Sequence, residues 1–360
     1  MLISILLPDL RAGGVENVRL VLAREFERVG HEVEFVLTQA SGELLGRARQ
    51  TYSVVDLAAP RARHMAGPLA AYLDRRQPDA VLAAMWPLTV IAPFARRLAR
   101  HHCPIVASEH NSLSIQYSGR SALHRHALRK SMAIGYRANT AVVAVSHGVA
   151  ADLSALSGLA MEDIDVIHNP VPEPPTTANS ADVEALWGTP SGSRILSVGT
   201  LKSQKNHALL IDAFARLPMS HARLMLVGTG KREDALRARA QELGVSERVI
   251  FAGFHADPRP FYTSADVFVL SSDYEGFGNV IIEALAAGTP VVSTDCPSGP
   301  AEILENGRYG RLVPVGDAIA LSAGIADALN DTKRPEVLRA RAAAFAPDVA
   351  AARYLECFAR

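Results

Sequence analysis

Two glutamates bracket a glycine-containing loop in the C-terminal half of the chain. Glu275 stands before the glycines, and Glu283 lies in the next segment, where apolar residues recur at helical spacing. Residues 267–272 form a strand-like run before the loop, and Gly288 ends the predicted helix. A strand, a glycine loop and a helix N-terminus in this order present backbone N–H groups to an anion.

The predicted anion site consists of Gly278, Asn279 and Val280, with Asn279 as the N-cap of the helix. A carboxylate beside a phosphate is repelled, so neither glutamate is expected to touch the anion itself. Carboxylates are good acceptors for sugar hydroxyls. We therefore expect Glu275 and Glu283 to face the two ends of a ligand that has phosphate in its middle and hydroxyls at both ends, as a nucleotide sugar has.

Seven residues separate Glu275 from Glu283, and the sequence Gly-Thr-Pro-Val-Val-Ser-Thr-Asp follows at residues 288–295. Together these features resemble the E-x7-E element of the retaining glycosyltransferases of family 4, which have the GT-B fold. The alternative is a surface helix with two solvated glutamates. The resemblance implies that Glu275 binds hydroxyls of the donor sugar and that Glu283 binds the ribose.

The resemblance also assigns roles to residues outside this element. Lys205 matches a family lysine that holds the donor diphosphate together with an arginine, but Thr200 stands where that arginine is expected. Lys202 is a candidate replacement for the missing cation, and a solvated Lys205 is the alternative to its diphosphate role. Phe254 follows a strand-like run and would border the nucleotide base, or else pack in the core.

Two positions in the N-terminal half complete the predicted site. Gly13 and Gly14 lack the full G-x-G-x-x-G pattern of dinucleotide-binding proteins. By the resemblance they form the loop that faces the donor, with a plain tight turn as the alternative. His110 follows the strand-like residues 105–108, at the end of a strand where ligands bind in parallel sheets. By the resemblance it orients the donor sugar near the anomeric carbon and joins Glu275 and Lys205 as a catalytic residue, and a histidine bonded only within its loop is the alternative.

Strand-like runs alternate with helical segments along the chain, which predicts parallel sheets covered by helices on both faces. With the resemblance, the expected fold is α/β, with two facing Rossmann-like, doubly wound domains of the GT-B type and a central cleft. The expected parts are an acceptor-side domain (1–170), a linker with a short helix near 181–186 (171–192), a nucleotide-sugar domain (193–345) and a C-terminal helix that packs back on the first domain (346–360). After Pro300 several helices are expected, the last over residues 349–358.

The composition narrows the class of protein. Lys and Arg number 37 and so do Asp and Glu, so the zero net charge gives no reason to expect nucleic acid as a partner. Three cysteines, far apart and without C-x-x-C spacing, suit a reducing compartment. No apolar run approaches the ~20 residues of a membrane span, and the first ten residues are typical of a strand rather than a signal peptide. These features predict a cytoplasmic protein.

One segment is strongly basic, although the chain as a whole has no net charge. Residues 96–137 hold eight Arg and Lys against Glu109 alone, and apolar residues interleave with the basic ones at 120–137. Such a helix suits peripheral contact with an anionic membrane surface, at the inner face of the cytoplasmic membrane, or contact with phosphates of the acceptor. A solvated helix face is the alternative, and sparse aromatic residues argue against nucleic acid.

The sequence predicts no metal site and no cofactor beyond a UDP- or GDP-sugar used as substrate. The triplet Asp163-Ile164-Asp165 has the D-x-D form that holds metal in other glycosyltransferases, but we interpret it as a surface turn. The predicted activity is retaining transfer of a hexose or N-acetylhexosamine to a glycan or lipid-linked glycan acceptor, in cell-surface polysaccharide synthesis. The alternatives are a nucleotide-sugar epimerase on the same scaffold and a non-catalytic sugar-nucleotide binding protein.

Overall fold

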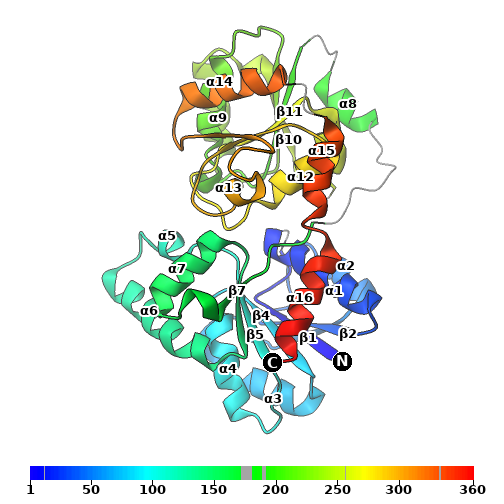
Figure 1. Cartoon of the computed structure of the whole chain (residues 1–360), viewed down its shortest axis with the longest axis vertical. Coiled ribbons are helices and arrows are strands. Elements are labelled where there is room, and N and C mark those ends of the chain that lie inside the picture. The colour runs from blue at the N-terminus through cyan, green and yellow to red at the C-terminus, as the bar shows by residue number, and fades with distance from the viewer. Residues whose placement is uncertain (12, 172–180, 189–191, 256, 332–333) are drawn as a thin grey trace. The chain divides into compact units, whose positions relative to one another are not determined.

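The computed structural model describes the chain except for residues 12, 172–180, 189–191, 256 and 332–333. The chain divides into two compact units: Met1–Pro172 with Ala346–Arg360, and Glu173–Phe345 (Figure 1). Each unit is built on one sheet whose named strands all pair in parallel. The predicted α/β class with two Rossmann-like sheets is therefore confirmed.

The first unit has a seven-stranded sheet of order β3-β2-β1-β4-β5-β6-β7. Its strands are β1 (Leu2–Leu7), β2 (Glu32–Leu37), β3 (Ser53–Asp56), β4 (Ala80–Ala84), β5 (Ile105–Glu109), β6 (Ala141–Ala144) and β7 (Ile164–Val166). Its helices are α1 (Gly14–Arg28), α2 (Leu45–Thr51), α3 (Ala66–Arg76), α4 (Leu88–Leu98), α5 (Leu113–Gln116), α6 (Ala122–Gly135), α7 (His147–Ser157) and α16 (Pro347–Phe358), with 3-10 turns η1 (Ala62–His64), η2 (Tyr136–Ala138) and η3 (Met161–Asp163).

The second unit has a six-stranded sheet of order β10-β9-β8-β11-β12-β13. Its strands are β8 (Arg194–Val198), β9 (Arg223–Val227), β10 (Val249–Gly253), β11 (Val267–Leu270), β12 (Val291–Thr294) and β13 (Arg311–Val313). Its helices are α8 (Ala181–Trp187), α9 (His207–Ala215), α10 (Glu233–Glu242), α11 (Arg259–Ser264), α12 (Asn279–Ala287), α13 (Pro300–Ile303), α14 (Ala318–Leu329) and α15 (Pro335–Ala343), with 3-10 turns η4 (Ser203–Lys205) and η5 (Ser246–Arg248).

One expectation about local structure is wrong, and one strand was not predicted. Besides the expected helices after residue 300, β13 pairs with β12 at the edge of the sheet. The D-x-D triplet is not a surface turn: Asp163 ends η3, and Asp165 lies in β7, where its carboxylate pairs with Arg360 at 2.7 Å. Each of these strands has only three residues, too few for a periodic pattern to identify.

Much of the predicted linker, 172–180 and 189–191, lies outside the described residues. The helix expected near 181–186 is α8, which packs within the second unit. Trp187 at its end is fully buried and donates a hydrogen bond from Nε1 to Ser264 Oγ at 2.8 Å. This helix is therefore part of the second unit's packing.

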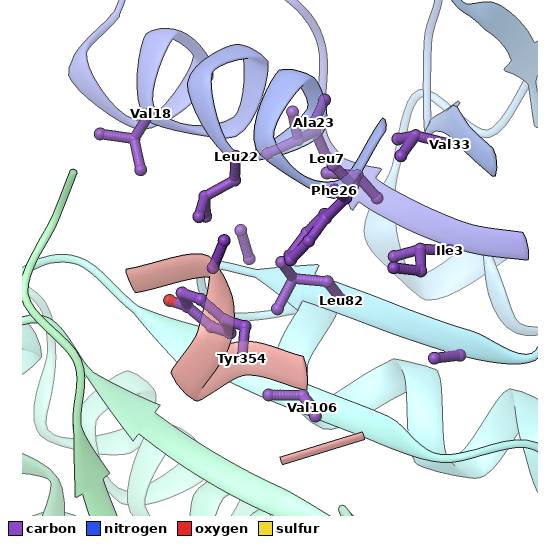
Figure 2. Close-up of a cluster of buried hydrophobic side chains, with 14 of the residues drawn as sticks. Ile3, Leu7, Val18, Leu22, Ala23, Phe26, Val33, Leu82, Val106 and Tyr354 are labelled. Carbon is purple, nitrogen blue, oxygen red and sulfur yellow. The ribbon is translucent and has the colours of Figure 1, made fainter. Parts of the chain in front are cut away.

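Helix α16 covers part of the first unit's sheet, although it is far from the rest of that unit in the sequence. Figure 1 shows it (red) beside α1, and Figure 2 shows Tyr354 among side chains of α1, β4 and β5. The rings of Phe358 and Phe26 lie 6.0 Å apart, and the Tyr354 hydroxyl is 3.0 Å from Ser108 Oγ. The core of the first unit is thus completed by α16.

We expect Phe26→Ala to lower the free energy of unfolding by about 3–5 kcal/mol, because the ring is fully buried and its loss leaves a cavity between α1 and α16. Urea denaturation followed by circular dichroism measures the change. Arg24→Ala, at an exposed position of the same helix, should change it by less than about 0.5 kcal/mol. Equal effects of the two substitutions would contradict this packing.

Candidate active site

In the second unit the predicted anion site is the junction between β11 and α12. Gly278 precedes the helix with φ 98° and ψ 49°, a left-handed conformation that a side chain would strain. The predicted N-cap is therefore wrong by one residue, since Gly278 takes that position and Asn279 is the first residue of the helix. Gly288 ends the helix at φ 83°, as predicted.

Lys205 and Glu275 meet beside this junction. The Lys205 Nζ atom lies 2.7 Å from Glu275 Oε1, and both side chains are largely buried, with 14% and 8% of their surfaces exposed. Ser272 donates a hydrogen bond to the same carboxylate oxygen at 2.5 Å, and Ser271 donates to the Lys205 carbonyl at 2.9 Å. The structure thus brings a cation and a carboxylate that can accept hydrogen bonds from hydroxyls together, beyond the carboxyl ends of the neighbouring strands β8 and β11.

Sequence analysis missed the contacts that hold these two residues in place. The amide of Gln204 donates to the Tyr274 carbonyl at 2.8 Å, and the Asp273 N–H donates to the Gln204 carbonyl at 2.9 Å. Asn206 donates to the Asp273 carboxylate at 2.7 Å and accepts from the Leu209 N–H at the start of α9. The available signal was Asn206 itself, a residue type favoured at helix N-caps.

Glu283 is held by a tyrosine that the sequence did not identify. The buried Tyr262, on α11, donates its hydroxyl proton to Glu283 Oε2 at 2.6 Å. Burial raises the pKa of Glu283, and the hydrogen bond from Tyr262 acts in the opposite direction. A fixed carboxylate at this position is suited to accept hydrogen bonds from paired hydroxyls.

The remaining predicted residues of this unit lie at strand ends. Thr200 is exposed, just after β8. Here two backbones approach closely, because a Cβ on Gly228 would lie 2.2 Å from the Gly199 carbonyl oxygen. Phe254 follows β10 and is 57% exposed, so the alternative of a packed core phenylalanine is wrong.

In the first unit the two predicted glycines begin α1. Gly13 is the N-cap, with extended backbone, and Gly14 is the first residue of the helix. A Cβ on Gly13 would lie 2.2 Å from Glu16 Oε2, so this carboxylate lies against the loop. Burial raises the pKa of Glu16. A side chain at position 13 would displace the Glu16 carboxylate from this helix terminus.

His110 is 5% exposed and lies at the end of β5. Its Nε2 atom is 2.8 Å from Arg19 Nη2 and 3.1 Å from Ser108 Oγ. The bond to Arg19 of α1 shows that His110 is not bonded only within its own loop. Burial first, and then the charge of Arg19, hold the pKa of His110 well below its usual range.

The adjacent Glu109 points to different partners. It accepts hydrogen bonds from Thr89 Oγ1 at 2.6 Å and from the Tyr136 hydroxyl at 2.5 Å. Burial raises the pKa of Glu109 to about 7, against the effect of these two donors. Successive residues of a strand face opposite sides of the sheet, so Glu109 and His110 belong to separate polar clusters.

Part of the basic segment forms α6, which exposes both basic and apolar side chains. A surface hollow of about 340 Å³ is lined by Ala122, Arg125, His126 and Arg129. Leu123 and Ile134 are 78% and 58% exposed. No helix within the described part of the chain is long and apolar enough to cross a bilayer. Among the described residues, no group of three or more His, Cys, Asp and Glu could hold a metal ion.

Two family models match the chain in succession. Glycosyltransferase Family 4 matches residues 12–173, and Glycosyl transferases group 1 matches residues 190–345. The structure of Anabaena HepE in complex with UDP-glucose superposes with a TM-score of 0.83 at 24% sequence identity, over 99% of this chain and 98% of that one. This likeness shows the fold.

Curated relatives match over shorter stretches. The lipopolysaccharide core biosynthesis glycosyltransferase LpsE of Rhizobium meliloti is 44% identical over 149 residues, which are 41% of this chain and 42% of the relative. The Campylobacter jejuni N-acetylgalactosamine-N,N'-diacetylbacillosaminyl-diphospho-undecaprenol 4-alpha-N-acetylgalactosaminyltransferase is 40% identical over 139 residues, 39% of this chain and 38% of the relative. The chain spans about two fifths of the length of these two relatives.

Taken in succession the two models cover most of the chain, and the fold they imply is the one the two sheets form. The chain belongs to glycosyltransferase family 4 and has the GT-B fold.

Proposed function

We propose that this protein is a retaining glycosyltransferase that moves a hexose or N-acetylhexosamine from a UDP- or GDP-sugar to a glycan or lipid-linked glycan. The observation that carries the proposal is the Lys205–Glu275 pair beside the N-terminus of α12. A cation and a helix N-terminus suit a diphosphate, and the carboxylate suits the hydroxyls of the sugar attached to it.

In the proposed reaction the bond between the anomeric carbon and the diphosphate breaks. A bond from an acceptor hydroxyl to that carbon forms on the same face of the sugar, and the proton of that hydroxyl passes to an oxygen of the leaving diphosphate. Negative charge develops on the leaving diphosphate, and Lys205 with the backbone N–H groups of Gly278, Asn279 and Val280 stabilises it without a metal. Glu275 binds the sugar, and Glu283, held by Tyr262, binds the ribose.

The names of the relatives and the surface of α6 support the proposed binding partners, which are the sugar donor, the acceptor and the membrane. The relatives' names refer to lipopolysaccharide core synthesis and to a diphospho-undecaprenol substrate, and HepE was solved with UDP-glucose. These names support a nucleotide-sugar donor and an acceptor in cell-surface polysaccharide synthesis. Helix α6 exposes Leu123 and Ile134, and it also exposes Arg125, Arg129 and Lys130, a combination that suits an anionic surface at the inner face of the cytoplasmic membrane.

We expect Glu275→Gln and Glu283→Gln each to lower kcat/KM by roughly ten- to hundred-fold, because each removes a charged hydrogen-bond acceptor worth about 1.5–3 kcal/mol. The donor is first identified by screening nucleotide sugars for thermal stabilisation, and turnover is then measured. Glu247→Gln, at an exposed position of the same unit, serves as the control. Unchanged turnover in both variants would refute the site.

The same assay separates the alternatives. Conversion of the nucleotide sugar without any acceptor would indicate an epimerase, and binding without turnover over many acceptors would indicate a binding protein.

Lys205→Ala should weaken binding of UDP or GDP and lower kcat about 100-fold or more, because it removes the cation next to the leaving group. Calorimetry with each nucleotide and steady-state kinetics measure the two effects. Arg216→Ala removes an exposed cation at the end of α9 and should change neither. An effect confined to the acceptor KM would contradict the diphosphate role.

Replacing Arg125, Arg129 and Lys130 together by Gln should weaken binding to phosphatidylglycerol vesicles about 100-fold, at about 1 kcal/mol for each basic residue. Sedimentation with vesicles measures the binding, and phosphatidylcholine vesicles give the baseline. The matched control replaces the exposed Arg61, Arg63 and Arg75 of the same unit. If the variant at Arg125, Arg129 and Lys130 binds the anionic vesicles as well as the wild type does, the proposed membrane contact is wrong. A raised acceptor KM in solution would then point to acceptor phosphates.

A further inference from the structure

Arg19 is a fully buried arginine in the first unit, on the inner side of α1. Its Nε and Nη1 atoms have no hydrogen-bond partner within the part of the chain that the structure describes. A buried guanidinium with unused donors opposes folding, because the water that satisfied them is lost. An apolar side chain of similar size would fill this space without that cost. The position of Arg19 therefore points to a role other than stability.

The contact that Arg19 does make is with His110. Its Nη2 atom lies 2.8 Å from His110 Nε2. A guanidinium can only donate hydrogen bonds, so Nε2 must accept. The proton of a neutral imidazole then lies on Nδ1, an assignment that follows from the chemistry of the donor.

We propose that Arg19 is a positioning residue that holds the His110 imidazole neutral, with its proton on Nδ1. The protonation state concerns the first unit alone. Its use in glycosyl transfer rests on the proposed function, together with the role near the anomeric carbon that the family resemblance implies for His110. There a neutral ring adds no positive charge to a carbon that is already losing its diphosphate.

The groups around His110 agree with this state. Arg19 approaches from α1, Tyr354 of α16 reaches it through Ser108, and Asn169 lies after β7. Burial and the charge of Arg19 lower the pKa of His110, and the side chain of Asn169 acts in the opposite direction. His110 Nδ1, which carries the proton in this state, is buried and has no hydrogen-bond partner among the described residues.

No carboxylate is among these groups. Glu109, the adjacent residue, bonds to Thr89 and Tyr136 instead. The guanidinium also lies over the Tyr354 ring, 5.4 Å from its centre. His110 therefore meets one positive charge and no compensating negative charge in this cluster, which favours the neutral ring.

Nitrogen-15 NMR of the full-length, ligand-free protein tests the proposal directly. The signals of His110, one of 12 histidines, are identified by their loss in His110→Gln. We expect a neutral ring with a protonated Nδ1 throughout pH 5.5–8 in the wild type. A ring protonated on Nε2, or one that titrates near its ordinary pKa of about 6.5, would overturn the proposal.

Two variants separate the charge of Arg19 from its hydrogen bond. Arg19→Met removes both, so the proton should shift toward Nε2 and the pKa of His110 should rise. Arg19→Gln keeps a donor without the charge, so the Nδ1 form should persist while the pKa rises. Arg24→Met, at an exposed position of α1, should change neither. His110 signals in Arg19→Met identical to those of the wild type would overturn the positioning role. If Arg19→Met does not fold, an unchanged pKa of His110 in Arg19→Gln would overturn it.

Activity distinguishes this inference from the proposed function. With the donor found by screening, Arg19→Met should lose up to about tenfold in kcat at pH 5.5 relative to the wild type, the loss reached if His110 recovers an ordinary pKa near 6.5. Its activity should recover as the pH rises and the ring loses its proton. A wild type that shows the expected NMR signature but turns over no donor would refute the proposed function and leave the role of Arg19 intact.

Discussion

The ion pair between Lys205 and Glu275 joins the two loops on which the candidate site of the second unit depends. Lys205 comes from the turn before α9 and Glu275 from the loop before α12, and the pair is largely withdrawn from water. Leaving one member of such a pair without its partner is costly. Under the proposed function, a donor diphosphate replaces Glu275 as the counterion of Lys205, and a sugar hydroxyl takes the place of the ammonium at Glu275. Binding of the two halves of the donor is coupled through this exchange.

The parts of this site that the sequence predicted are those set by local rules. The spacing of Glu275 and Glu283 and the glycine at the end of the helix could be identified without tertiary information, and so could the alternation of strand and helix. The N-cap was misplaced by one residue because Gly278, not Asn279, takes the left-handed conformation. Which of two neighbouring residues adopts it depends on how the loop packs.

The parts that the sequence could not predict are contacts between distant residues. Tyr262 and Glu283 meet across two helices, and Arg19 meets His110 across 91 positions of the chain. An arginine on an amphipathic helix is normally assigned to the solvent face. The spacing of Arg19 from Val15, Leu22 and Phe26 places it on the apolar stripe of α1, but no local pattern names His110 as its partner, because that contact depends on the placement of α1 beside the end of β5.

The return of the chain to its first unit has a consequence for biosynthesis. Helix α16 is translated after the whole of the second unit, yet its Tyr354 and Phe358 cover the sheet formed by the earliest strands. During synthesis on the ribosome, the apolar surface that α16 covers, including Phe26 and Val106, remains exposed while the roughly 170 residues of the second unit are made. This surface stays open to non-native contacts until α16 has left the ribosome and packed on it.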